Sequence, residues 1–100
     1  MVTPTSEARV VVPNKLGLHA RPAAQFVKLS STFPCEILVG RDDVEVNGKS
    51  IMGVMMLTAE RGAELVIRAV GAEAEEAVRQ LAALVARGFD EDDEGRPIHA

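Results

Sequence analysis

The sequence predicts an α+β fold, a two-layer sandwich with the element order β-α-β-β-α-β-α. Three observations support this prediction. Four short segments alternate apolar and polar residues, which is typical of strands with one buried face. Three other segments carry helical periodicity or helix start and stop residues. Strands that bury only one face need one layer of helices, so we expect an antiparallel or mixed sheet covered on one side.

The strands follow from alternation and from turn residues. Ala8, Val10 and Val12 share one face of the first strand, and the later strands repeat this period-two pattern. Pro34 stops the preceding helix before the second strand, and Asn47-Gly48 closes the third. The predicted strands are residues 7–13, 35–39, 44–46 and 64–69.

The helices are predicted from apolar stripes and end signals. The first, residues 20–30, has a stripe through Ala20, Ala23, Ala24, Val27 and Ser31, widened by Phe26. The second, residues 51–57, follows a possible N-cap residue, Ser50. The third begins near Glu73 and ends before Gly88, a residue that suits a helix C-terminus. Its stripe is Ala74, Ala77, Val78, Leu81, Leu84 and Val85.

Length and composition indicate one domain. The chain has 100 residues, 47% of them hydrophobic, and a net charge of −4, as expected of an ordinary globular protein. It has three Phe and no Trp or Tyr, so it lacks stacking platforms and we expect no nucleic-acid binding. No segment has the ~20 apolar residues of a membrane span, and the N-terminus does not resemble a signal peptide. We therefore expect a cytoplasmic protein.

The predicted domain covers residues 7–89. Residues 1–6 are expected to be a flexible N-terminus, and residues 90–100 a disordered acidic tail that contains His99. Lone Cys35 is interpreted as a small core residue. The carboxylates show no spacing that indicates a metal site.

The stretch around His19 carries the main functional signal. Pro22 marks the first turn of a helix, so His19 lies at or beside the N-cap, where backbone N–H groups lack helical acceptors. Such a terminus attracts anions, and Arg21 adds a full positive charge. The same field disfavours the imidazolium, so we expect a neutral, nucleophilic ring near neutral pH. A nucleophile within an anion site suits a phosphoryl carrier, whereas the alternative is an ordinary surface histidine.

The apolar segment after Ser50 is the second signal. Residues 51–57 read Ile-Met-Gly-Val-Met-Met-Leu and are apolar nearly all round. One sheet cannot cover every face of such a helix, so some of these side chains should be exposed, and exposed Met suits protein partners. A fully covered core helix is an equal alternative. The candidates for exposure are Ile51, Met52, Val54 and Met55.

Together the two stretches resemble the HPr family, the histidine phosphocarriers of the bacterial phosphoenolpyruvate-dependent phosphotransferase system. Gly17-Leu-His-Ala-Arg-Pro-Ala-Ala24 matches the family's active-centre signature, and Lys49-Ser-Ile-Met-Gly-Val-Met55 matches its regulatory-type signature. The resemblance covers residues 7–89. It implies an open-faced sandwich of four strands and three helices, and a stoichiometric carrier rather than an enzyme, without a cofactor. The sequence Phe89-Asp-Glu91 at the end of the last helix is similar to that of members in nitrogen-related branches of the family. The output could therefore be nitrogen-related rather than sugar transport alone.

The resemblance also implies roles for single residues. His19 would be phosphorylated at Nδ1, Arg21 would contact the phosphate, and Pro22 would shape the helix start. Ser50 would be the site that a dedicated kinase modifies in many members. The implied partners are an enzyme I-type phosphoryl donor, an enzyme IIA-type or related acceptor, and a Ser50 kinase/phosphorylase. The implied docking residues are Lys49, Ile51, Met52, Val54 and Met55.

Two other functions stay open. One is an HPr-like regulatory protein that acts through Ser50, although regulatory relatives without transfer also lack the histidine. The other is a small acylphosphatase-like enzyme, which needs an enclosed anion loop and an amide or acid that places water. From the sequence we expect neither feature beside Arg21.

Overall fold

Four strands form one fully antiparallel sheet in the computed structural model, which describes residues 2–98. The spatial order is β1-β4-β2-β3, so β4 lies at the centre between β1 and β2. The antiparallel alternative is therefore the one observed. The strands are β1 (Thr5–Val11), β2 (Glu36–Arg41), β3 (Val44–Asn47) and β4 (Glu64–Val70).

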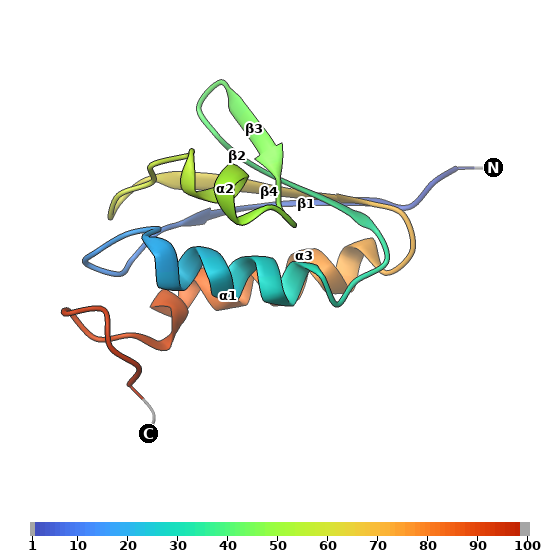
Figure 1. Ribbon diagram of the computed structural model, residues 1–100. Coiled ribbons are helices and arrows are strands. Elements are labelled where there is room, and N and C mark those ends of the chain that lie inside the picture. Colours follow the sequence, from blue (N-terminus) through green and yellow to red (C-terminus); the bar gives the residue numbers. More distant parts are fainter. Residues whose placement is uncertain (1, 99–100) are drawn as a thin grey trace.

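Three helices cover one face of this sheet, which confirms the predicted fold. They are α1 (Ala20–Ser30), α2 (Ile51–Met55) and α3 (Ala74–Ala86), followed by a 3-10 turn, η1 (Gly88–Asp90). Figure 1 shows α1 and α3 side by side beneath the sheet, while the short α2 packs against α1 and β3. No helix among residues 2–98 is long and apolar enough to cross a membrane.

The core lies between the sheet and the helices. Along β4, Leu65, Ile67 and Ala69 are buried, while the residues between them are partly exposed, as period-two alternation predicts. Ile67 pairs with Ala8 of β1 and Val39 of β2, so three strands contribute to the same layer. The largest fully buried side chains include Phe26, Phe89, Ile37 and Leu81. These residues join α1, α3, η1 and the sheet into one core.

The buried face of α1 differs from the predicted stripe. Ala20, Ala24 and Ser31 are exposed. The buried residues are Pro22, Ala23, Phe26 and Ser30, so the helix is rotated relative to the predicted line. Phe26 explains the difference, because one buried aromatic ring outweighs several alanine methyl groups.

The N-terminal boundary is also corrected. Thr5 and Ser6 already pair with β4, opposite Val70 and Ala69. The Gly71 N–H donates to the Pro4 carbonyl at 2.8 Å. The expected flexible residues 1–6 therefore include two strand residues, because the sheet continues beyond the apolar run that marked its start.

The segment after α3 differs most from expectation. Gly88, Phe89 and Asp90 all adopt positive φ angles, of 69°, 58° and 55°, and the Phe89 side chain is fully buried. Residues 91–97 then form a tight hairpin closed by a bridge between Glu91 and Pro97. The structure thus describes residues 90–98 in a defined turn and hairpin where the sequence predicted disorder, whereas His99 lies outside the described residues.

Candidate functional site

The loop before α1 positions His19. The Leu18 N–H donates to the Ala59 carbonyl at 2.8 Å, which ties the loop to the segment after α2. Gly17 has a φ of +67°, and a Cβ there would lie 2.5 Å from the Ala59 carbonyl oxygen. Only glycine fits this left-handed, closely packed position. The chain therefore reaches His19, the N-cap residue of α1, along a fixed path.

The start of α1 carries the feature on which the predicted anion site depends, namely backbone N–H groups that find no acceptor within residues 2–98. The His19 side chain makes no capping hydrogen bond, and its carbonyl accepts the Ala23 N–H at 3.0 Å. Pro22 has no N–H to donate. Within residues 2–98, the N–H groups of Ala20 and Arg21 donate to no acceptor. These free groups add to the positive end of the helix dipole.

Glu91 completes the site, and the sequence reasoning missed it. Its oxygens lie 3.0 and 3.1 Å from Nε2 of His19, and Oε2 accepts from Arg21 Nη1 at 3.0 Å. Asn14 Nδ2 donates to Oε1 at 2.6 Å and to the Gly17 carbonyl at 2.8 Å. The Glu91 side chain is fully buried, while those of His19 and Arg21 are 32% and 30% exposed. These three donors make burial of the carboxylate tolerable.

These contacts define the protonation pattern of the ring. An ionised carboxylate only accepts hydrogen bonds, so Nε2 of His19 carries the proton beside Glu91. This assignment comes from the hydrogen-bond network, and it leaves the lone pair of the neutral ring on Nδ1.

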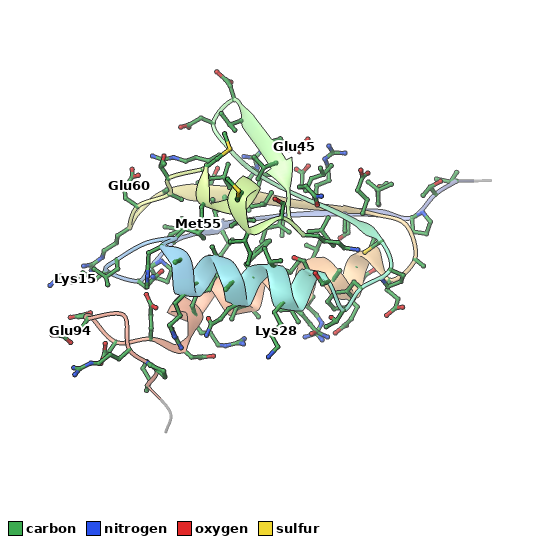
Figure 2. The ribbon with its side chains drawn as sticks, viewed as in Figure 1. Lys15, Lys28, Glu45, Met55, Glu60 and Glu94 are labelled. Atoms are coloured by element: carbon green, nitrogen blue, oxygen red, sulfur yellow. The ribbon has the colours of Figure 1, made fainter. Side chains whose placement is uncertain are left out.

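The C-terminal hairpin packs against the same edge of the ring. A Cβ built on Gly95 would lie 3.2 Å from Cε1 and 3.4 Å from Nε2 of His19. Asp92 braces the hairpin, because its carboxylate accepts the N–H groups of Glu94 and Arg96, each at 2.9 Å. These bonds, the Arg96 N–H first, lower the pKa of Asp92. Figure 2 shows Glu94 of this hairpin and Lys15 at the same end of the molecule, where α1 begins.

The segment after Ser50 is partly exposed and partly core. Ser50 is the N-cap of α2, and its Oγ accepts the Gly53 N–H at 3.1 Å. Val54 is fully buried, so it is excluded as a docking residue. The side chains that reach solvent are Ile51 (45% exposed), Met52 (77%), Met55 (40%) and Met56 (72%).

Val54 is the buried residue of α2, whereas Met56, the C-cap residue of this helix, is exposed. Met56 was not among the predicted docking residues. Lys49 Nζ donates to the Phe33 carbonyl at 2.7 Å, beyond the end of α1. Figure 2 shows Met55 on α2, above α1. We call the exposed set Ile51, Met52, Met55 and Met56 the α2 surface.

Other candidate residues have ordinary surroundings. Cys35 is a free, buried thiol just before β2, as predicted for a core residue. Arg41 donates to Glu60, and this bond lowers the pKa of the Glu60 carboxyl. Within residues 2–98, no three His, Cys, Asp or Glu side chains gather as metal ligands.

An open-faced sandwich with a histidine at the N-terminus of its first helix is the arrangement expected of a small phosphocarrier protein. Residues 6–87 match the family described as PTS HPr component phosphorylation site. The chain therefore belongs to the HPr family of the phosphotransferase system, whose members are carriers rather than enzymes.

Several relatives agree with this assignment. Phosphocarrier protein HPr of Pseudomonas aeruginosa is 46% identical over 83 residues, which cover 82% of this chain and 92% of that protein. Phosphocarrier protein NPr of Escherichia coli K12 is 37% identical over 89 residues, covering 88% and 99%.

Solved structures show the same fold. The crystal structure of HPr-C-His from Thermoanaerobacter tengcongensis has a TM-score of 0.83 and 42% identity, over 87% of this chain and 98% of that one. The solution structure of Crh, the Bacillus subtilis catabolite repression HPr, has a TM-score of 0.62 and 41% identity, over 80% and 95%.

Proposed function

We propose that this chain accepts a phosphoryl group on Nδ1 of His19 from an enzyme I-type donor. It then passes the group to an enzyme IIA-type or related acceptor of the phosphotransferase system. The supporting observation is His19 at the start of α1, beside the free N–H groups of Ala20 and Arg21. Membership of the HPr family supports the same role.

The chemistry requires only a nucleophile and a stable anion site. The lone pair of Nδ1 attacks phosphorus, and the bond from phosphorus to the donor atom breaks, with its electron pair leaving on the donor. The helix terminus and Arg21 stabilise the negative charge on the phosphoryl oxygens. Onward transfer reverses these steps, so the domain needs no cofactor of its own.

We further propose that donor and acceptor dock on the α2 surface. Four exposed apolar side chains cluster on and just after one short helix, and three of them are adaptable methionines. The Leu18–Ala59 hydrogen bond connects the segment after α2 to the loop that holds His19. A partner seated on this surface would therefore contact the structural unit that carries the phosphoryl group.

Ser50 is proposed as a regulatory site in addition to its capping role. The cap alone explains its presence, since its Oγ accepts the Gly53 N–H. Regulation is supported by its position next to Ile51 and Met52 of the α2 surface, and by the match of residues 49–55 to the family's regulatory-type signature. A phosphate there would place about −1.5 to −2 charges at the docking face.

Two alternatives are tested together with the carrier. An acid and an amide do lie beside Arg21, contrary to the sequence expectation, and both are found in small hydrolytic sites. However, both oxygens of Glu91 already accept hydrogen bonds, from Asn14, His19 and Arg21, and its side chain is fully buried, so this acid is not free to place water. The similarity to Crh supports the alternative of a regulatory protein that acts through Ser50. The presence of His19 supports phosphoryl transfer instead.

The test combines the chain with phosphoenolpyruvate and a purified enzyme I-type donor, followed by mass spectrometry. A carrier gains one acid-labile, alkali-stable phosphate per chain and loses it on addition of an acceptor. Multiple turnover of an acyl phosphate by the chain alone would instead establish the enzyme. Modification of Ser50 by its kinase without any histidine label would establish the regulatory protein.

A further inference from the structure

We propose that Glu91 is a positioning residue for phosphoryl transfer. Its carboxylate holds the proton on Nε2 of His19, and the hairpin of residues 91–97 closes that edge of the ring. Nδ1 is thereby left as the nucleophilic nitrogen. This inference rests on the proposed function, because it concerns the same ring.

The contacts restrict the ring to one orientation. Both oxygens of Glu91 lie within 3.1 Å of Nε2, and Gly95 lies so close to the ring that a Cβ there would be 3.2 Å from Cε1. A ring rotated by half a turn would present a carbon to the buried carboxylate and leave that acceptor with one donor fewer. Unpaired burial of charge is costly, so this rotated state is disfavoured.

The carboxylate is itself fixed from two other directions. Asn14 Nδ2 donates to Oε1, and Arg21 Nη1 donates to Oε2. Asn14 also donates to the Gly17 carbonyl, so the carboxylate is tied to the loop that delivers His19. Loop, helix and C-terminal hairpin thus meet at one buried side chain.

The backbone just before Glu91 is strained. Phe89 and Asp90 both adopt left-handed backbone conformations that residues other than glycine rarely take. They are held there by burial of the Phe89 ring and by the contacts of Glu91. Strain that persists because its surroundings over-determine it is typical of functional sites.

The placement of Glu91 suits the charge changes of the reaction. As the Nδ1 lone pair forms the bond to phosphorus, positive charge develops on the ring and spreads to the Nε2–H group. The carboxylate stabilises this charge while the proton remains on Nε2, as an orienting carboxylate does for other catalytic histidines. Glu91 lies at the opposite ring nitrogen from the incoming phosphoryl group, so it does not occupy the transfer position.

The test compares Glu91→Ala and Glu91→Gln with a matched control, Asp93→Asn. Asp93 is an exposed carboxylate of the same hairpin, without a contact to the ring among the described residues. Histidine-specific ¹⁵N NMR reports which nitrogen of the neutral ring is protonated, and rapid-quench kinetics reports the second-order rate constant for phosphorylation. Amide spectra confirm that each variant is folded.

In the wild type and in Asp93→Asn, we expect a protonated Nε2 whose proton exchanges slowly with water. Glu91→Ala should lose this protected proton and react about 10- to 100-fold more slowly. The rate of Glu91→Gln should lie between those of the wild type and Glu91→Ala, because its amide oxygen still accepts a hydrogen bond from Nε2–H but carries no charge. An unchanged Nε2 signal in Glu91→Ala, or a rate equal to or above the wild-type rate, would overturn the proposal. A wild-type chain that takes no phosphate would refute the proposed function instead, and the NMR comparison would still test the contact.

Discussion

Replacing Met52 by Glu separates docking from folding. The Met52 side chain is 77% exposed, so its replacement should change the free energy of unfolding by no more than about 0.5 kcal/mol. Its neighbour Val54 is fully buried and serves as the matched control. Val54→Ala removes two carbon groups at about 0.8 kcal/mol each and leaves a cavity, so it should cost about 2–3 kcal/mol.

Transfer should be slowed in Met52→Glu and nearly unchanged in Val54→Ala. A glutamate at position 52 that becomes buried and unpaired beneath a partner costs about 1–3 kcal/mol, or roughly 5- to 150-fold in the rate constant. Val54→Ala should transfer at nearly the wild-type rate at a temperature where it remains folded.

Urea unfolding measures the stability of both variants, and the initial rate of phosphorylation by the enzyme I-type donor measures docking. Transfer at the wild-type rate by Met52→Glu would refute the α2 surface as the docking site. A loss of more than 2 kcal/mol in its unfolding free energy, on the order of a core substitution, would refute the exposure on which the reasoning depends.

Three further predictions concern residues around the site. Ser50→Asp should keep the cap and the melting temperature but slow phosphorylation, most at low salt. Ser50→Ala should transfer normally and lose about 1 kcal/mol of unfolding free energy in urea. If both variants are phosphorylated at the same rate, Ser50 is a cap only. Because the pKa of Asp92 is lowered in the folded chain, its ionised carboxylate stabilises the hairpin at pH values above 3.8, and this stabilisation is lost as the pH falls through the folded-state pKa. The Arg96 amide should therefore lose its protection from hydrogen exchange when the pH falls below the folded-state pKa of Asp92. Asp92→Asn should abolish this pH dependence. Gly17→Ala should destabilise the chain by about 1–2 kcal/mol or more in thermal unfolding, because alanine is strained at a φ of +67° and its Cβ would clash with the Ala59 carbonyl oxygen. A wild-type melting temperature in this variant would contradict the description of the loop.

Most of the fold could be predicted because its signals are local. The alternation of Leu65, Ile67 and Ala69 identifies a strand with one buried face, and Pro22 identifies the start of a helix. The rotation of α1 could not be read from its alanines, since the weight of Phe26 depends on the partners it meets in the core. In the same way, a five-residue helix is too short for its own pattern to show that Val54 is buried.

The site was only half predictable. His19 and Arg21 are two residues apart, so the sequence places them together. Glu91 lies 72 residues from His19 and belongs to an acidic run whose composition suggested disorder. The turn formed by Asp92 and Gly95 is a local signal that could have revealed the hairpin, because Asp often initiates turns and Gly accepts positive φ. The contact with the ring follows only from the tertiary structure.

The central claim is that His19 accepts the phosphoryl group. The most direct measurement is mass spectrometry of three chains after incubation with phosphoenolpyruvate and the enzyme I-type donor: wild type, His19→Ala and His99→Ala. We predict a single acid-labile phosphate on the wild type and on His99→Ala, and none on His19→Ala. Undiminished labelling of His19→Ala would contradict the account.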